Sequence, residues 1–405
     1  MQLLRLIRIV SFVALVGSMG CGDDNPAAPN NGAAPEPLSF FRFHEAAVVI
    51  GQVGMTSMGP NASTPDVGPQ GLNNPQTAVA ASGSGPLYVV DYGNSRVLGF
   101  AGIPTSNGPT AAFVLGQTDF VSNTGGTTSR TLRSPLDCAV SNGELFVVDY
   151  GNNRVLIWKS LPTTTNAAAQ VVLGQPDFTS FAADVASDRL QEPRAVAAAN
   201  GRVFVVDGGN HRVLIWNSSP GSNGKAADVV VGQPNMNTRT PGLSQTALFG
   251  PNSVWTDGKR LIVGDTEHTR VLIWNSIPTS NGAPADVVVG QPDFETGATN
   301  VASATTFRGI GGVASDGTSL FVSDNGANRI LIFTPIPTEN GAAAVNVIGQ
   351  DSFTADFAND QNQDGVTDSG PTERTLSSPS RIRAQGNRLM IADEDNHRVL
   401  FYISN

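Results

Sequence analysis

The stretch Val205–Trp216, VVDGGNHRVLIW, decides the fold, because five similar stretches occur elsewhere in the chain. They are VVDYGNSRVLGF from Val89, VVDYGNNRVLIW from Val147, VGDTEHTRVLIW from Val263, VSDNGANRILIF from Val322 and IADEDNHRVLFY from Ile391. Every copy has an aspartate five residues before an arginine, and these pairs are Asp91 and Arg96, Asp149 and Arg154, Asp207 and Arg212, Asp265 and Arg270, Asp324 and Arg329, and Asp393 and Arg398. A second motif, two apolar residues and Gly-Gln, ends at Gln52, Gln117, Gln175, Gln233, Gln291 and Gln350. The two interleaved series divide the chain into six units.

Each unit reads as four short strands separated by turn residues. In the third unit the strands are predicted over 171–173, 195–198, 203–206 and 212–216, with Asn200-Gly201 and Gly208-Gly209-Asn210 as turns. The apolar runs are continuous rather than alternating, which is typical of sheets covered on both faces. Six such units predict an all-β, six-bladed propeller of four-stranded antiparallel blades. Because the chain begins with a lone strand before Gln52 and ends after Tyr402, the N-terminal strand should complete the last blade.

The repeated core resembles NHL repeats. The resemblance rests on Asp-x-Gly-Asn-x-Arg-Val-Leu, with Asn-His-Arg at 210–212 and 396–398, and it extends from about Glu45 to Tyr402. The unit is longer than a typical NHL repeat and carries an added Gly-Gln-Pro-Asp-Phe string at 174–178 and 290–294. In this it is similar to an exported bacterial variant of the family, which implies the propeller fold and little about activity.

The N-terminus is predicted to be a targeting segment. Arg5 and Arg8 precede an apolar run and then small residues that end at Cys21. This pattern predicts a signal peptide over 1–20 and a lipidated Cys21, although Ser18 stands where such signals usually have leucine; an ordinary cleaved signal peptide is the alternative. Residues 21–44, rich in Pro, Ala and Asn, should form a disordered tether, and 45–405 the propeller. The expected location is therefore the periplasm or the cell surface, on a membrane anchor.

Composition narrows the range of partners. The chain has 34 acidic and 24 basic residues, a net charge of −10, which argues against nucleic acid as a partner. With Cys21 lipidated, Cys138 has no partner, and it is expected to be a small buried core residue rather than a reactive thiol.

The repeated aspartates and arginines are interpreted as structural. Each aspartate is expected to accept hydrogen bonds from backbone amides of the tight turn that follows it. Each arginine is expected to pair with a carboxylate across that turn or on the next blade. On this basis Asp207→Ala should cost about 1–3 kcal/mol of stability.

Residues that differ between copies on the innermost strand are the candidate ligand-binding positions. They surround the prolines that begin this strand and are Asp137, Arg194, Asn252, Trp255, Arg308, Arg381 and Arg383. With several arginines among them, these residues favour an anionic or extended ligand at the channel mouth, on the face that carries the connections between blades. Solvated charges at the rim are the alternative.

The sequence offers candidate sites for two metals, calcium and zinc. The sixth unit is longer than the others because it contains DQNQDGVTD, residues 360–368, in which Asp360, Asn362, Asp364 and Asp368 follow calcium-loop spacing with glycine at the sixth position. Pro371 replaces the acidic residue expected at position twelve, so a solvated polar insertion is the alternative. Some six-bladed relatives of NHL-repeat proteins are lyases with histidine zinc ligands. In this chain the turn positions of His211 and His397 hold Ser or Asn in other copies, and because neither Ser nor Asn is a preferred zinc ligand, no zinc site is expected.

No catalytic constellation stands out in the sequence. The leading hypothesis is therefore a non-enzymatic binding or scaffolding propeller of the cell envelope, with a protein, peptide or glycan as ligand. The alternative is a propeller enzyme, either a lyase or a calcium-dependent lactonase-like hydrolase, that uses the central channel.

Overall fold

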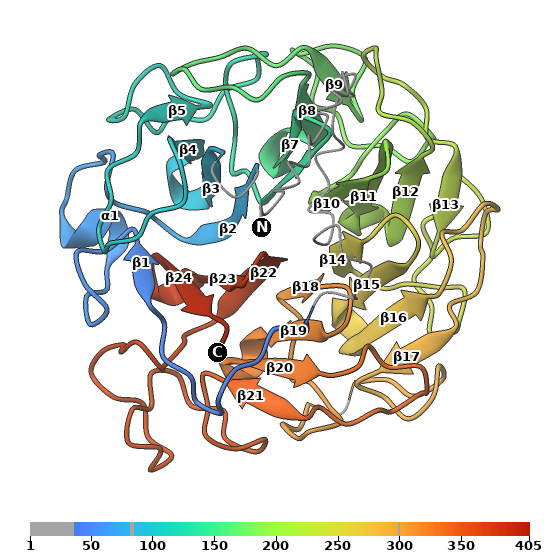
Figure 1. Ribbon diagram of the computed structural model, residues 1–405. Helices are drawn as coiled ribbons and strands as arrows, with labels where there is room; N and C mark the ends of the chain where they lie inside the picture. Colours follow the sequence, from blue (N-terminus) through green and yellow to red (C-terminus); the bar gives the residue numbers. More distant parts are fainter. Residues whose placement is uncertain (1–35, 82–84, 299) are drawn as a thin grey trace, which may run out of the picture.

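The computed structural model describes residues 36–81, 85–298 and 300–405, and they form a closed ring of six four-stranded sheets around a central axis (Figure 1). All strand pairs within the sheets are antiparallel, as in the third blade, where Val205 pairs with Val196 on one side and Leu214 on the other. The prediction of an all-β, six-bladed propeller is confirmed.

The blades follow one another along the chain, and each runs from an innermost to an outermost strand. Blade 1 contains β2 (Pro75–Ala80), β3 (Leu87–Asp91), β4 (Arg96–Phe100) and β5 (Phe113–Leu115). Blade 2 contains β6 (Asp137–Ser141), β7 (Glu144–Asp149), β8 (Arg154–Trp158) and β9 (Val171–Leu173). Blade 3 contains β10 (Pro193–Ala199), β11 (Arg202–Asp207), β12 (Arg212–Trp216) and β13 (Val229–Val231).

The second half of the ring repeats this arrangement. Blade 4 contains β14 (Pro251–Thr256), β15 (Leu261–Asp265), β16 (Arg270–Trp274) and β17 (Val287–Val289). Blade 5 contains β18 (Gly312–Ser315), β19 (Leu320–Asp324), β20 (Arg329–Phe333) and β21 (Asn346–Ile348). Blade 6 contains β22 (Pro379–Gln385), β23 (Arg388–Asp393), β24 (Arg398–Ile403) and β1 (Val48–Ile50).

The hydrophobic core lies between the blades. Phe204 and Ile215 of blade 3 pack in one cluster with Leu272 and Val288 of blade 4, and Trp216 packs with residues of blade 2. Both faces of each sheet are therefore buried, which explains why the strands read as continuous apolar runs. Burial of a large side chain at these positions contributes about 1.5–3 kcal/mol.

The ring is closed by the strand nearest the N-terminus. β1 pairs antiparallel with β24, with Val49 opposite Leu400, so the two ends of the chain share one sheet (Figure 1). The predicted closure is confirmed, and β1 covers the edge of β24 that would otherwise be unpaired.

A loop from each of blades 1 to 5 also covers the outermost strand of the blade before it. In blade 3 the Asn223 side chain accepts a hydrogen bond from the N–H of Val172 in β9 at 3.1 Å, and the Gly224 N–H donates to the Val172 carbonyl at 2.9 Å. Gly224 has a φ of 61°, in the left-handed region that favours glycine. Asn107-Gly108, Asn281-Gly282 and Asn340-Gly341 repeat this contact on β1, β13 and β17.

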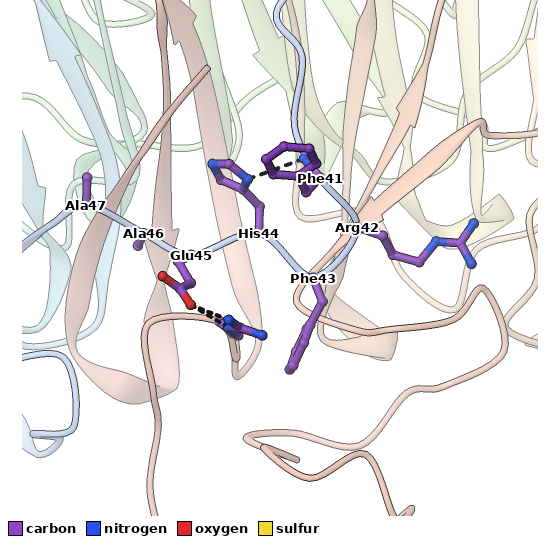
Figure 2. Close-up of a pocket in the computed structure, with 8 residues that line it drawn as sticks. Phe41, Arg42, Phe43, His44, Glu45, Ala46 and Ala47 are labelled. Atoms are coloured by element: carbon purple, nitrogen blue, oxygen red, sulfur yellow. Dashed lines mark hydrogen bonds and ion pairs between the residues drawn. The ribbon is translucent and has the colours of Figure 1, made fainter. Parts of the chain in front are cut away.

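Blade 6 has no such loop, because its outermost strand comes from the N-terminus. The N-terminal segment, residues 36–47, takes the place of the loop on blade 5: the Phe43 N–H donates to the Val347 carbonyl of β21, and Asn346 donates to the Phe40 carbonyl at 2.6 Å. Phe43 has a φ of 55°, close to that of Gly224. Figure 2 shows residues 41–47 of this segment, in which Glu45 forms an ion pair with Arg374.

The N-terminal segment corrects one predicted boundary. Leu38 and Phe40 are buried in the core between blades 5 and 6, and the Leu38 N–H donates to Asp316 at 2.7 Å. The tether was expected to extend to residue 44, so the packed body starts several residues earlier than predicted. Sequence composition missed this because only two apolar side chains anchor the segment. The expected signal peptide over 1–20, Cys21 and most of the tether lie outside the described residues.

Helix is nearly absent from the described part of the chain. The helical turn α1 (Pro60–Ser63) has left-handed backbone angles at Asn61 and Ala62, and six 3-10 turns follow the second strands of the blades. Across the described ranges, none of the helices has the length and apolar character needed to cross a membrane.

Candidate functional site

The propeller has two different faces. The 3-10 turns and the connections from one blade to the innermost strand of the next lie at one end of the strands, and we call this end the mouth face. The hairpins between the first and second strands, together with the loops between the third and fourth, lie at the other end, which we call the hairpin face. Of the predicted ligand residues, Asp137, Arg194, Asn252 and Arg308 lie at the mouth-face end of the innermost strands, whereas Trp255 lies at the hairpin end of β14.

The six repeated Asp–Arg pairs are fully buried beneath the mouth face. In blade 3, Arg212 Nε donates to Asp207 Oδ2 at 2.7 Å, and Asn210 donates to the same oxygen at 2.8 Å. Asp207 Oδ1 accepts the N–H of Gln191 at 2.6 Å. Gln191 precedes the innermost strand, so the expectation that the following turn supplies the amide was wrong. The aspartate instead holds the entry connection of its own blade.

Each repeated arginine also binds carbonyls on both sides of its blade. Arg212 donates from one terminal nitrogen to Met236 at 2.5 Å and from the other to Ala186 at 2.7 Å and Arg189 at 3.2 Å. Burial raises the pKa of Asp207, while the charge of Arg212 and the donated hydrogen bonds oppose that rise. All polar atoms of this group are engaged within the protein, so the pair has a structural role.

The residue after each 3-10 turn joins neighbouring blades. His211 Nδ1 accepts the N–H of Gly250 at 3.1 Å, and His397 Nδ1 accepts the N–H of Asn74 at 3.0 Å. Asn153 makes the same contact to Glu192 through its side-chain oxygen at 2.8 Å. Burial lowers the pKa of both histidines. The histidines are turn residues, and within the described ranges no three His, Cys, Asp or Glu side chains are arranged to hold a metal ion.

The predicted ligand residue Arg381 crosses the central channel. From β22 of blade 6 it donates to Gln76 of blade 1 at 3.1 Å, to the Arg194 carbonyl of blade 3 at 2.6 Å and to the Asn252 side chain of blade 4 at 3.2 Å. It is 2% exposed, and burial lowers its pKa. The backbone of blade 5 approaches this strand closely, because a Cβ on Gly312 would lie 2.9 Å from the Arg381 Cα.

Asp137 and Asn252 extend this network. Asp137 accepts from Arg383 at 2.6 Å and from the Val196 N–H of blade 3 at 3.0 Å, and its other contact is Arg381 Nε at 3.8 Å. Asn252 donates to the Ile310 carbonyl of blade 5 at 3.3 Å. Side chains of the protein itself therefore join all six blades at the axis, and Asp137, Asn252 and Arg381 all take part in these contacts.

The other three predicted residues do not meet in one place. Arg308 pairs with Asp356 of the following connection, and Arg194 lies 3.7 Å from Glu192. Trp255 is half-buried against the cores around blades 5 and 6. Arg308, Arg381 and Arg383 thus each have a carboxylate or a backbone carbonyl as partner, whereas Arg194 only lies near a carboxylate, and the anionic ligand stays a prediction.

Sequence reasoning missed a ring of residues around the channel mouth. It consists of the first residue of each 3-10 turn, directly after the repeated aspartate: Tyr92, Tyr150, Gly208, Thr266, Asn325 and Glu394. Arg194 fills the space beside Gly208, since a Cβ there would lie 2.7 Å from Arg194 Cδ. Burial raises the pKa of Tyr150, and the charges of Glu192 and Arg194 act on it in opposite directions. The signal was available in the sequence, because this position varies between copies while its neighbours recur.

The predicted calcium loop is a compact turn on the mouth face. Asp360 accepts the N–H groups of Asp364 at 3.2 Å and Gly365 at 2.9 Å, and Asp368 accepts that of Gln361 at 2.8 Å. Asn362 donates to Asp364 at 3.0 Å. The carboxylates of the loop thus organise its own backbone, and calcium binding stays a prediction that titration calorimetry with Ca²⁺ can test.

Two further features lie away from the mouth. Cys138 is fully buried in the core between blades 1 and 2, and burial raises its pKa, which makes it a poor nucleophile. A pocket of about 490 Å³ lies beside the N-terminal segment and is lined by residues 41–47 and Arg374 (Figure 2).

The chain is similar to several solved structures at low sequence identity. No curated protein matches the chain significantly. Similar solved structures include a streptogramin B lyase (12% identity, 85% of this chain and 95% of that one, TM-score 0.44) and a protein of unknown function from Bacteroides thetaiotaomicron (14%, 89% and 75%, TM-score 0.47). Another is the WD40 β-propeller domain of Doa1 (10%, 89% and 97%, TM-score 0.45). The NHL repeat family matches residues 190–216, the end of the entry connection and the first three strands of blade 3.

Proposed function

We propose that this chain is a non-enzymatic binding or scaffolding propeller that presents its mouth face to a protein, peptide or glycan ligand. One observation carries the proposal: Arg381 and Asp137 form contacts to other blades across the axis, whereas the six equivalent positions around the mouth carry different side chains. Side chains that are engaged with other blades in this way are poorly placed to act as catalytic groups in the channel. Variation at symmetric positions is what recognition of an asymmetric ligand requires.

The composition of the mouth ring suits binding. Tyr92 and Tyr150 are half-buried on the mouth face, to which Arg194 also belongs, and Tyr and Arg are among the residue types that contribute most to binding interfaces. Burial raises the pKa of Glu394, and the side chain of Gln76 and the charge of Arg381 oppose that rise. The ring thus combines aromatic surface, a cation and a carboxyl group around one opening.

Co-purification from native membranes tests this role. The variant Tyr92→Ala/Tyr150→Ala/Arg194→Ala should lose partners that the unaltered protein retains. Its matched control, Lys225→Ala/Lys259→Ala/Arg388→Ala on the hairpin face, should keep them. An unchanged partner set in the mouth variant would refute the proposed site. Stoichiometric metal in the purified protein would favour the enzyme alternative instead.

We further propose that the protein is displayed in the cell envelope through lipid on Cys21, behind a signal peptide over 1–20. The support is the basic, apolar and small-residue order of the N-terminal sequence. Mass spectrometry of the membrane-extracted protein should find an N-terminal diacyl-modified cysteine. Cys21→Ser should release the protein from the membrane fraction; retention in that fraction would contradict the anchor.

A further inference from the structure

The two faces of the propeller differ strongly in charge. The mouth-face segments are the connections 51–74, 116–136, 174–192, 232–250, 290–311 and 349–378 and the 3-10 turns with the residue after each. These segments contain 17 acidic and 6 basic residues. The hairpins and loops of the hairpin face contain 5 acidic and 4 basic residues. Because the repeated Asp–Arg pairs cancel, the net charge of −10 resides almost wholly on the mouth face.

The same face carries most of the exposed apolar side chains. Of ten large hydrophobic residues that are well exposed, eight lie in the mouth-face connections, and only Phe41 and Val345 lie elsewhere among the described residues. Phe181, in the connection after blade 2, is 55% exposed and follows Asp177 by four residues. Val121, in the connection after blade 1, and Phe357, in the connection after blade 5, likewise follow a nearby aspartate in the sequence, Asp119 and Asp356 respectively. These side chains are spread over all six connections, so apolar groups stand among the charged loops around the whole mouth face.

The carboxylates beside these apolar groups are held in their charged form. Asp177 accepts hydrogen bonds from the N–H groups of Thr179 and Ser180, both at 2.8 Å, and these bonds lower its pKa to about 2. Asp119 and Asp293 lie in equivalent loops, and the hydrogen bonds donated by those loops lower the pKa of each. The negative charge at Asp119, Asp177 and Asp293 therefore persists at a lower pH than that of an ordinary aspartate.

We propose that the mouth face docks a basic protein segment in which lysines or arginines alternate with apolar residues. This inference rests on the proposed binding function and names the chemistry of its partner. The acidic field attracts cations and repels nucleic acid and anionic lipid, and the exposed Val and Phe side chains require apolar groups to cover them. The arginines around the channel cannot reverse this preference, because Arg308, Arg381 and Arg383 are already engaged with the protein's own acceptors.

Charge neutralisation on one face at a time tests the proposal. The mouth variant is Asp119→Asn/Asp177→Asn/Asp293→Asn, which keeps the turns, because Asn235 in blade 3 accepts the equivalent N–H at 3.0 Å. The matched hairpin-face variant is Asp228→Asn/Asp257→Asn/Asp286→Asn, which removes the same charge from residues that also accept backbone N–H groups. The probe is a 20-residue synthetic peptide with alternating lysine and leucine separated by serine, with a glutamate-for-lysine version as control.

Binding to the full-length protein is measured by surface plasmon resonance at 50 and 300 mM NaCl. The lysine peptide should bind the unaltered protein about tenfold more weakly at the higher salt, where screening is stronger. The mouth variant should bind about fivefold more weakly than the unaltered protein, and the hairpin-face variant within about twofold of it. Equal losses in both variants, equal binding of the glutamate peptide, or no binding of the lysine peptide would each overturn the inference. Displacement of the peptide by 1 mM CaCl₂ at matched ionic strength would do so too, by assigning the face to divalent cations.

The result can be separated from that of the proposed function. If native partners are lost from the Tyr92→Ala/Tyr150→Ala/Arg194→Ala variant but remain bound to the triple Asp→Asn variant at high salt, the binding function stands and the cationic partner is wrong. If both variants lose the same partners and those partners are basic, both proposals are supported.

Discussion

Replacing Arg212 with leucine would test the structural role of the repeated Asp–Arg pairs. The change removes the ion pair to Asp207 at 2.7 Å and the donors to the carbonyls of Met236, Ala186 and Arg189. Both members of the pair are 0% exposed, so the carboxylate would be left buried without its counter-charge. Breaking a buried ion pair by removing one partner costs about 3–5 kcal/mol. This exceeds the 1–3 kcal/mol expected from the sequence for Asp207→Ala, because the sequence did not reveal the additional carbonyl contacts.

The expected loss is large enough to measure in a thermal scan. A ring of this size has an unfolding entropy of about 0.8 kcal/mol per kelvin, so the melting temperature should fall by about 4–6 °C. Differential scanning calorimetry at pH 7.5 measures this directly. Arg212→Lys should lose about half as much, because lysine keeps the charge but cannot reach the four acceptors together.

Arg202→Leu is the matched control for this measurement. Arg202 begins β11 in the same blade, is partly exposed and forms no ion pair with other described residues. Its replacement should change the melting temperature by less than about 1 °C. If Arg212→Leu and Arg202→Leu give the same small shift, the repeated pair does not hold the connections in place and the structural reasoning fails.

Three further predictions follow from the contacts between blades. Because the pKa of His211 and His397 is lowered in the folded protein, the unfolded chain binds more protons below pH 6.5, so stability should be complete above that pH and decrease as the pH drops toward the folded-state pKa. Calorimetry at pH 7.5 and 5.0 should show a smaller decrease in melting temperature for His211→Asn/His397→Asn than for the unaltered protein. An equal decrease would show that other groups cause the pH dependence. Removal of residues 1–46 should uncover β21 and produce aggregation by light scattering on warming, whereas removal of residues 1–35 should leave the protein unchanged, and identical behaviour of the two truncations would contradict the covering role of the N-terminal segment. Arg381→Met should lower the melting temperature more than Arg383→Met, since Arg381 is 2% exposed and contacts three other blades, while the reverse order would show that Arg381 does not join the ring.

Residue patterns alone located only part of the candidate functional surface. The sequence marked the innermost strands as the place where copies differ, and four of the residues named there converge on the axis: Asp137, Asn252, Arg381 and Arg383. Their roles were different from those expected, because Arg381 and Asp137 are bound by the other blades rather than exposed. The varying position after the repeated aspartate, which forms the mouth ring, was overlooked although it was visible in the aligned copies.

By itself the sequence determined the number of blades, the strand that closes the ring and the burial of Cys138. These features depend on local repetition and on apolar periodicity, both of which are readable over a few residues. Only the tertiary structure decided which side chains meet at the axis, that residues 36–47 replace a missing loop, and that one face holds nearly all of the net charge. The physical reason is that ring closure brings together positions such as Asp137 and Arg383, which lie 246 residues apart and share no local signal.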